Sequence, residues 1–166
     1  MNLRPPANRV DPRARRWWAL QAWVLPAVPM LLVALTMFTL SLLFFPGALV
    51  WLGPLLAVVL VLPAVLYALV MPSWRYRVHA WELGSRAVYA ASGWFWQKHR
   101  VTPLSRVQTV DTTQGPLQRV FDLATVVVTT ASTHGDVKIA GLAAADADQL
   151  ARRIGEAAEA IPGDAT

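Results

Sequence analysis

Residues 17–74 read WWALQAWVLPAVPMLLVALTMFTLSLLFFPGALVWLGPLLAVVLVLPAVLYALVMPSW, a stretch without Asp, Glu, Lys or Arg. A helix that crosses a bilayer needs about 20 apolar residues, so this stretch has room for two crossings. We expect the first span at about 24–44 and the second at about 49–70. Between them Phe45, Pro46 and Gly47 predict a turn, because proline cannot continue a helix and glycine accepts positive φ. Residues 17–74 are therefore predicted to form a two-helix transmembrane hairpin.

Basic residues flank the uncharged stretch on both sides. Since Lys and Arg near a span stay in the cytoplasm, and two spans bring the chain back to its starting side, we expect both termini to be cytoplasmic. Arginines at this level can contact anionic lipid, and tryptophans can anchor in the interface. A cleaved signal peptide and a buried soluble helix pair are less favoured, since a signal's apolar core spans only about 7–15 residues. The candidate lipid-contacting residues are Arg13, Arg15, Arg16, Arg75 and Arg77, and the candidate anchors are Trp17, Trp18, Trp23 and Trp74.

The remaining residues, 75–166, have nearly balanced charge and a pattern of short strands. The balance argues against a nucleic-acid partner, which would need a broad basic surface. After Gly141 the apolar residues, among them Leu150 and Ile154, recur at helical spacing. Strands followed by one amphipathic helix predict an α+β domain. Residues 1–16 then form a basic cytoplasmic tail, flexible over about the first 12 residues. Strands are expected within 75–80, 86–90, 94–101, 106–110, 123–130 and 137–139.

Few residues of the types that carry chemistry are present. The chain has no cysteine, which excludes disulfides, a catalytic thiol and a zinc site built on Cys. His79, His99 and His134 are too scattered to predict a metal site. A triad of Ser105, His99 and Asp111 would lack the Gly-x-Ser-x-Gly elbow of many hydrolases. We expect no metal, no cofactor and no enzymatic activity.

Residues 94–100, WFWQKHR, interleave aromatic and basic side chains. On a strand, Trp94, Trp96, Lys98 and Arg100 would share one face, and packing of the tryptophans on the sheet, the bilayer or the hairpin is the favoured interpretation. Contact with lipid headgroups, an acidic protein or single-stranded nucleic acid is the alternative. Separately, Arg106 and Arg119 are expected to pair with Asp111 or Asp122.

Two motifs carry a resemblance to a known family. Residues 101–110 read VTPLSRVQTV and residues 117–124 read LQRVFDLA. With Gly93 before them and two spans at the N-terminal side, they resemble the bacterial pleckstrin-homology-like family, the YdbS-like membrane-flanked domain, over roughly 13–161. One departure is Asp122, where that family commonly has glycine. The motif positions are Gly93, Pro103, Arg106, Gln108, Leu117, Arg119 and Phe121.

The resemblance implies a bent, mostly antiparallel, partly closed sheet capped by a C-terminal helix, and no catalytic residues. We expect a non-catalytic binding or assembly module on the cytoplasmic face of a bacterial inner membrane. Its partners would be the lipid bilayer and a protein or a second copy of the chain. The alternative is an auxiliary subunit of a membrane transport or export complex, with Thr36, Thr39 and Ser41 contacting partner helices.

Overall fold

The computed structural model describes residues 6–44, 47, 49–130 and 135–160. It divides into two compact units. The helical unit is Trp18–Ser73, and the sheet unit comprises the residues before Trp18 and after Ser73.

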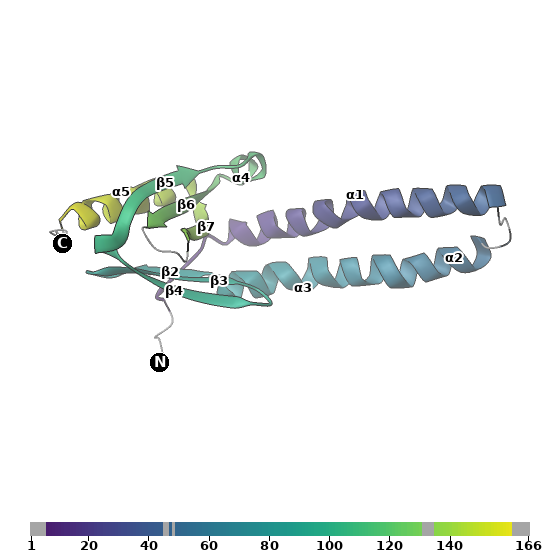
Figure 1. Ribbon diagram of the computed structural model, residues 1–166, viewed down its shortest axis with the longest axis horizontal. Helices are drawn as coiled ribbons and strands as arrows, with labels where there is room; N and C mark the ends of the chain where they lie inside the picture. Colours follow the sequence, from purple (N-terminus) through teal and green to yellow (C-terminus); the bar gives the residue numbers. More distant parts are fainter. Residues whose placement is uncertain (1–5, 45–46, 48, 131–134, 161–166) are drawn as a thin grey trace. The chain divides into compact units, whose positions relative to one another are not determined.

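The described part of the helical unit contains helix α1 and a second helical segment, in which a π-helical turn joins α2 to α3. Helix α1 is Arg13–Phe44, α2 is Leu49–Leu56, the π-helical turn is Ala57–Val61, and α3 is Leu62–Val78. Ala22 of α1 forms a buried cluster with Ala68 and Met71 of α3, and Figure 1 shows the two helices side by side. Small side chains at such a contact let two helices approach closely.

Most other side chains of this unit are large, apolar and exposed. Leu31, Leu43 and Trp51 are each about 70% exposed or more, a surface that water disfavours and hydrocarbon accepts. By length and composition, Arg13–Phe44 and Val50–Val78 could each cross a membrane. Of the predicted turn, Phe45 and Pro46 lie outside the described residues.

The sheet unit contains two antiparallel sheets, in the order β1-β2-β3-β4 and β5-β6-β7. A short helix, α4, joins β5 to β6, and the C-terminal helix α5 lies against the second sheet (Figure 1). The pattern of antiparallel strands followed by one helix is as predicted. The strands are β1 Asn8–Arg9, β2 Ala80–Leu83, β3 Ala87–Gly93, β4 Gln97–Pro103, β5 Val107–Thr113, β6 Leu123–Thr130 and β7 Val137–Ala143, and the helices are α4 Pro116–Val120 and α5 Ala144–Glu159.

One apolar core stabilises the sheet unit. Strand β6 alternates, with Val126 and Val128 completely buried, and Leu150 and Ile154 of α5 are buried by at least 98%. The apolar face of the strand and the apolar face of the helix therefore contribute to the same core, as expected for a sheet covered by an amphipathic helix. In the sequence this helix is followed by Pro162 and Gly163, a pair that stops helices, and both lie outside the described part of the chain.

The strand predicted at 75–80 is wrong for most of its length, because α3 continues to Val78 and β2 begins only at Ala80. The alternation of Tyr76 and Val78 with arginines fits a strand, but a helix already formed upstream extends at little cost. Arg75 and Arg77 also fall in its last turn, where positive charge interacts favourably with the helix dipole.

The prediction of a flexible N-terminal tail is wrong where the structure describes it. Asn8 and Arg9 form β1, which pairs with Trp81 and Ala80 of β2, and Val10 is buried. A two-residue strand has no alternation to detect in the sequence, and its order comes from the strand edge that it pairs with.

Asp11 connects β1 to the start of α1. Its backbone N–H donates to the carbonyl of Gly141 at 2.9 Å, and its Oδ1 accepts from the backbone N–H of Arg13 at 2.7 Å. The Arg13 side chain bonds the same oxygen at 3.1 Å. Burial raises the pKa of Asp11, but these bonds outweigh it and leave the pKa below its ordinary value.

Candidate functional site: a basic cleft beside strand β4

The outer edge of β4 borders an open cleft of about 600 Å³. All seven residues of the strand, Gln97–Pro103, line this cleft. Alternate residues of a strand face opposite sides, so a lining of consecutive residues means that the strand's edge, and not one face, borders the space. Among the strands that the structure describes, β4 is the last of its sheet, so on this edge its backbone N–H and C=O groups are not paired with another described strand.

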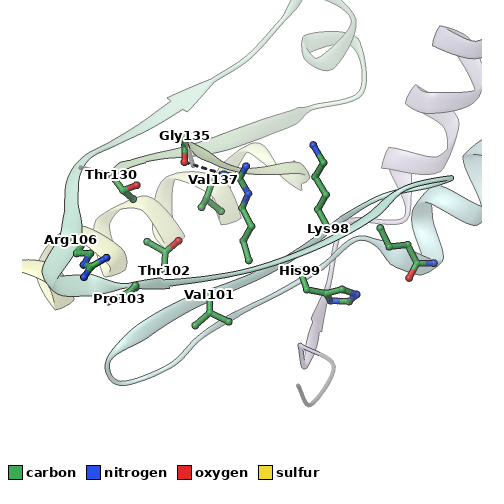
Figure 2. Close-up of a pocket in the computed structure, with 11 residues that line it drawn as sticks. Lys98, His99, Val101, Thr102, Pro103, Arg106, Thr130, Gly135 and Val137 are labelled. Atoms are coloured by element: carbon green, nitrogen blue, oxygen red, sulfur yellow. Dashed lines mark hydrogen bonds between the residues drawn. The ribbon is translucent and has the colours of Figure 1, made fainter. Parts of the chain in front are cut away.

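The described lining carries three formal positive charges, from Lys98, Arg100 and Arg106, and no carboxylate. We call it the basic cleft. Arg100 is fixed, because its Nη1 donates to the carbonyl oxygens of Gly135 and Asp136 at 3.0 and 2.9 Å. Figure 2 shows Lys98 and His99 on opposite sides of the strand. An anionic group is the chemistry that this lining fits.

A second groove, of about 740 Å³, shares Lys98 with the basic cleft. It is also lined by Arg75 and His79 after the helical unit, by Gly93 and Trp96 of the β3–β4 hairpin, and by Asp136 and Lys138. The Nδ1–H of His79 donates to the carbonyl of Arg75 at 2.8 Å. Burial, assisted by the charge of Arg75, lowers the pKa of His79 to about 4, although the hydrogen bond acts in the opposite direction.

Trp94, Phe95 and Trp96 form the turn between β3 and β4; we call them the aromatic tip. The predicted strand over 94–101 is wrong for these three residues, since β4 begins at Gln97. Phe95 and Trp96 are 72% and 76% exposed, so they do not pack on the sheet.

The predicted anchors and lipid-contacting arginines differ in exposure. Trp17 and Trp18 are buried, whereas Trp23 and Trp74 are about half exposed, so only the latter pair offers substantial ring surface to an interface. Arg13 is engaged by carboxylates of the chain, and Arg75 lines the second groove. The remaining members of the arginine set, Arg15, Arg16 and Arg77, are exposed.

The family-motif positions have mainly structural surroundings. Gly93 has a φ of +111°, and a Cβ there would collide with the carbonyl oxygen of Trp96. Asp122 has a φ of +53°, so the turn keeps a left-handed conformation that glycine adopts most easily. Pro103 ends β4, Arg106 lies in the turn after it, Gln108 is exposed on β5, Leu117 and Arg119 are on α4, and Phe121 follows α4.

The predicted pairing of Arg106 or Arg119 with Asp122 is wrong in the described part of the chain. Asp122 pairs instead with Arg13, at 3.2 Å, and Asp111 accepts a hydrogen bond from Thr109 at 3.2 Å. Tertiary packing places residues that are far apart in the sequence next to each other. The local sequence around Arg119 therefore does not reveal that Asp122 pairs with Arg13.

The structure does not assemble the imagined triad. Among the described residues no hydrogen bond links Ser105, His99 and Asp111, and no group of three His, Asp or Glu side chains comes together to hold a metal.

In α1 the hydroxyls of Thr36 and Thr39 donate to the carbonyls of Leu32 and Leu35 in their own helix, while Ser41 is buried.

Sequence reasoning missed Gln118. This buried side chain accepts from the N–H of Gly115 at 2.9 Å and donates to the hydroxyl of Thr125 at 2.8 Å. It thereby caps α4 and ties this helix to β6. A glutamine three residues after Gly115, with a proline between them, was the available signal.

Comparisons with known proteins agree with this architecture. Residues 23–158 match the bacterial PH domain family. The transmembrane protein YdbS of Bacillus subtilis (strain 168) is 32% identical over 160 residues, which cover 96% of this chain and 97% of that protein. No solved structure matches the chain significantly. The family match and the nearly full-length identity confirm the resemblance drawn from the motifs, and the chain belongs to the bacterial PH domain family, as a YdbS-like member with two apolar helices ahead of the domain.

Proposed function

We propose that this protein is a non-catalytic binding module, anchored in the bacterial inner membrane by two transmembrane helices. Its PH-like domain and both termini lie in the cytoplasm, and the basic cleft holds an acidic segment of a protein partner. The relative's name, transmembrane protein, and the two apolar helices support the membrane anchor.

Strand pairing supports the proposed orientation. Asn8–Arg9 precedes the first apolar helix and Ala80–Leu83 follows the second, yet the two strands are neighbours in one sheet. Residues that share a sheet lie on one side of a membrane, and an even number of crossings satisfies this requirement. The flanking arginines favour the cytoplasm for that side.

The edge of β4, which pairs with no other strand in the described part of the chain and lies beside three cations, is the observation that carries the proposed binding role. An extended segment can add to a strand edge through backbone hydrogen bonds. Carboxylates on that segment would meet Lys98, Arg100 and Arg106, which gives the site both a shape and a charge preference.

Site-specific crosslinking of the full-length protein in cells tests this role. A photoactivatable side chain at Gln97, in the cleft, should capture a defined protein that the same side chain at Ser85, in the β2–β3 turn, does not capture. Lys98→Glu with Arg106→Glu should abolish the capture. The matched reversal, Arg119→Glu with Arg152→Glu, lies outside the cleft and should preserve it.

Two results would count against the role. Identical products from both positions, or a product that survives reversal of the cleft charges, would mean that the cleft does not select its partner. Crosslinks from Gln97 to lipid alone would replace the protein partner by the bilayer.

A further inference from the structure

The aromatic tip exposes three consecutive large rings at the end of a hairpin. Trp94 is 37% exposed, and Phe95 and Trp96 are exposed by more than 70%. The ring of Phe95 contacts both tryptophans, with centroids 5.9 Å from Trp94 and 5.4 Å from Trp96. The rings of Phe95 and Trp96, with the exposed part of Trp94, therefore form a projecting apolar surface, which water disfavours.

The backbone holds this projection in place. Gly93 ends β3 in a left-handed conformation, and the carbonyl of Trp96 occupies the position where a side chain of residue 93 would start. Such a close approach requires glycine. This contact fixes the backbone conformation of the turn, so the hairpin itself holds the rings in their exposed position.

The second groove places the tip near the level of the membrane surface. Trp96 and Arg75 line this groove together. Arg75 is the first charged residue after the uncharged stretch and still belongs to helix α3, so in a membrane-anchored chain it lies at the headgroup level. The tip is thus at the end of the sheet unit where the chain leaves the bilayer.

The charges beside the tip suit an anionic leaflet. Lys98 and Lys138 line the same groove as Trp96, against one carboxylate, that of Asp136. Tryptophan rings favour the interface between headgroups and hydrocarbon, and each nearby basic residue adds attraction to anionic lipid. Rings and cations at one end of the hairpin have the chemistry of a lipid surface.

We propose that the aromatic tip inserts into the headgroup region of the cytoplasmic leaflet, with Lys98 and Lys138 beside anionic phospholipid. The domain is then held against the membrane at a second point in addition to α3. This inference goes beyond the proposed function, since it fixes the orientation of the domain whatever the basic cleft binds. It rests on the same membrane anchor.

The absence of cysteine makes a depth measurement direct. The spans keep the chain in the membrane whether or not the tip inserts, so a binding assay would not respond. The full-length Phe95→Cys variant, labelled with an environment-sensitive fluorophore, is placed in nanodiscs of phosphatidylcholine and phosphatidylglycerol. Ser85→Cys, exposed at the other end of β3, is the matched control, and both sites are on the surface, so neither label disturbs the core.

The label at position 95 should show blue-shifted emission, quenching by nitroxide-bearing lipid and loss of quenching by iodide in the buffer. The label at position 85 should show no blue shift, no quenching by nitroxide-bearing lipid, and full quenching by iodide in the buffer. In the Phe95→Cys background, Lys98→Glu with Lys138→Glu should diminish the blue shift, whereas Arg152→Glu with Arg153→Glu, on α5, should leave it unchanged.

Two results would overturn the proposal. If iodide reaches position 95 as easily as position 85, the tip lies in water. If position 95 is protected from iodide without being quenched by nitroxide lipid, a protein surface, such as a second copy of the chain, covers the tip. Failure of the proposed function has a different signature, because loss of the Gln97 crosslink leaves both fluorescence results unaffected.

Discussion

Protonation of His79 should destabilise the sheet unit as the pH falls from about 6.5 to about 4. The folded protein holds this imidazole buried and neutral, with a pKa of about 4 against an ordinary value of 6.5. Each tenfold difference in proton affinity between the folded and unfolded states is worth about 1.4 kcal/mol. The gap therefore corresponds to about 3 kcal/mol of unfolding free energy, a substantial part of the stability of a small domain.

The sign follows from which state takes up the proton. Below pH 6.5 the unfolded chain protonates His79, whereas the folded chain does so only near pH 4. The stabilisation is therefore complete above 6.5, declines as the pH falls, and is lost at about 4. The low pKa of Asp11 acts in the same direction, but below its ordinary value of 3.8.

Chemical unfolding of the full-length protein in detergent, followed by near-ultraviolet circular dichroism between pH 4 and pH 8, measures this effect. Subtracting the profile of His79→Gln from that of the native chain cancels the contributions of other groups. His99→Gln, at an exposed position of β4, is the matched control and should keep the native profile. A profile for His79→Gln that runs parallel to the native one would refute the reasoning.

Four further outcomes follow from the structure. Gly93→Ala should destabilise the sheet unit by more than about 1 kcal/mol, because the added methyl collides with the carbonyl of Trp96; an unchanged unfolding midpoint would contradict this. Asp122→Gly should change stability by less than about 1 kcal/mol, since relief of the left-handed φ offsets loss of the exposed pair with Arg13, whereas Asp122→Val should be clearly less stable in the same unfolding assay. Ile154→Ala removes a fully buried side chain and should cost about 2–5 kcal/mol, measured as a lower denaturation midpoint; a loss below about 1 kcal/mol would show that the site collapses around the cavity. A fluorescent reporter that matures only in the cytoplasm, fused to the C-terminus, should be bright, and activity of a periplasm-dependent reporter at the same place would reverse the proposed topology.

Strong local signals in the sequence predicted much of this fold. The uncharged stretch and the helical spacing of Leu150 and Ile154 each depend on neighbouring residues alone. The extension of α3 to Val78 was hidden, since a strand pattern there competes with the propagation of an existing helix. Strand β1 was also hidden, because two residues acquire their conformation only from a partner at Ala80 and Trp81.

The candidate sites were harder to predict for the same reason. The cluster WFWQKHR was visible in the sequence, but strand alternation assigned Trp94 and Trp96 to one face, and a turn of three residues removed them from the strand. Arg106, which follows the end of β4, lines the basic cleft together with Lys98 and Arg100 of that strand. Asp122 forms an ion pair with Arg13, which is distant from it in the sequence. Contacts of this kind depend on tertiary packing, which no local pattern encodes.

The pairing of β1 with β2 also orders events during biogenesis. The ribosome releases Asn8 and Arg9 before either apolar helix, while their partners Ala80 and Trp81 emerge only after both. In a chain anchored as proposed, the first sheet can therefore be completed only after both apolar helices have been made, and only when β1 and β2 lie on the same side of the membrane. A chain in which only one of the two helices crossed the membrane would leave the edge of β2 unpaired and Val10 without its buried site, and such an incomplete domain is the kind of substrate that quality-control proteases recognise. In the proposed topology, completion of the first sheet thus depends on both crossings having been made.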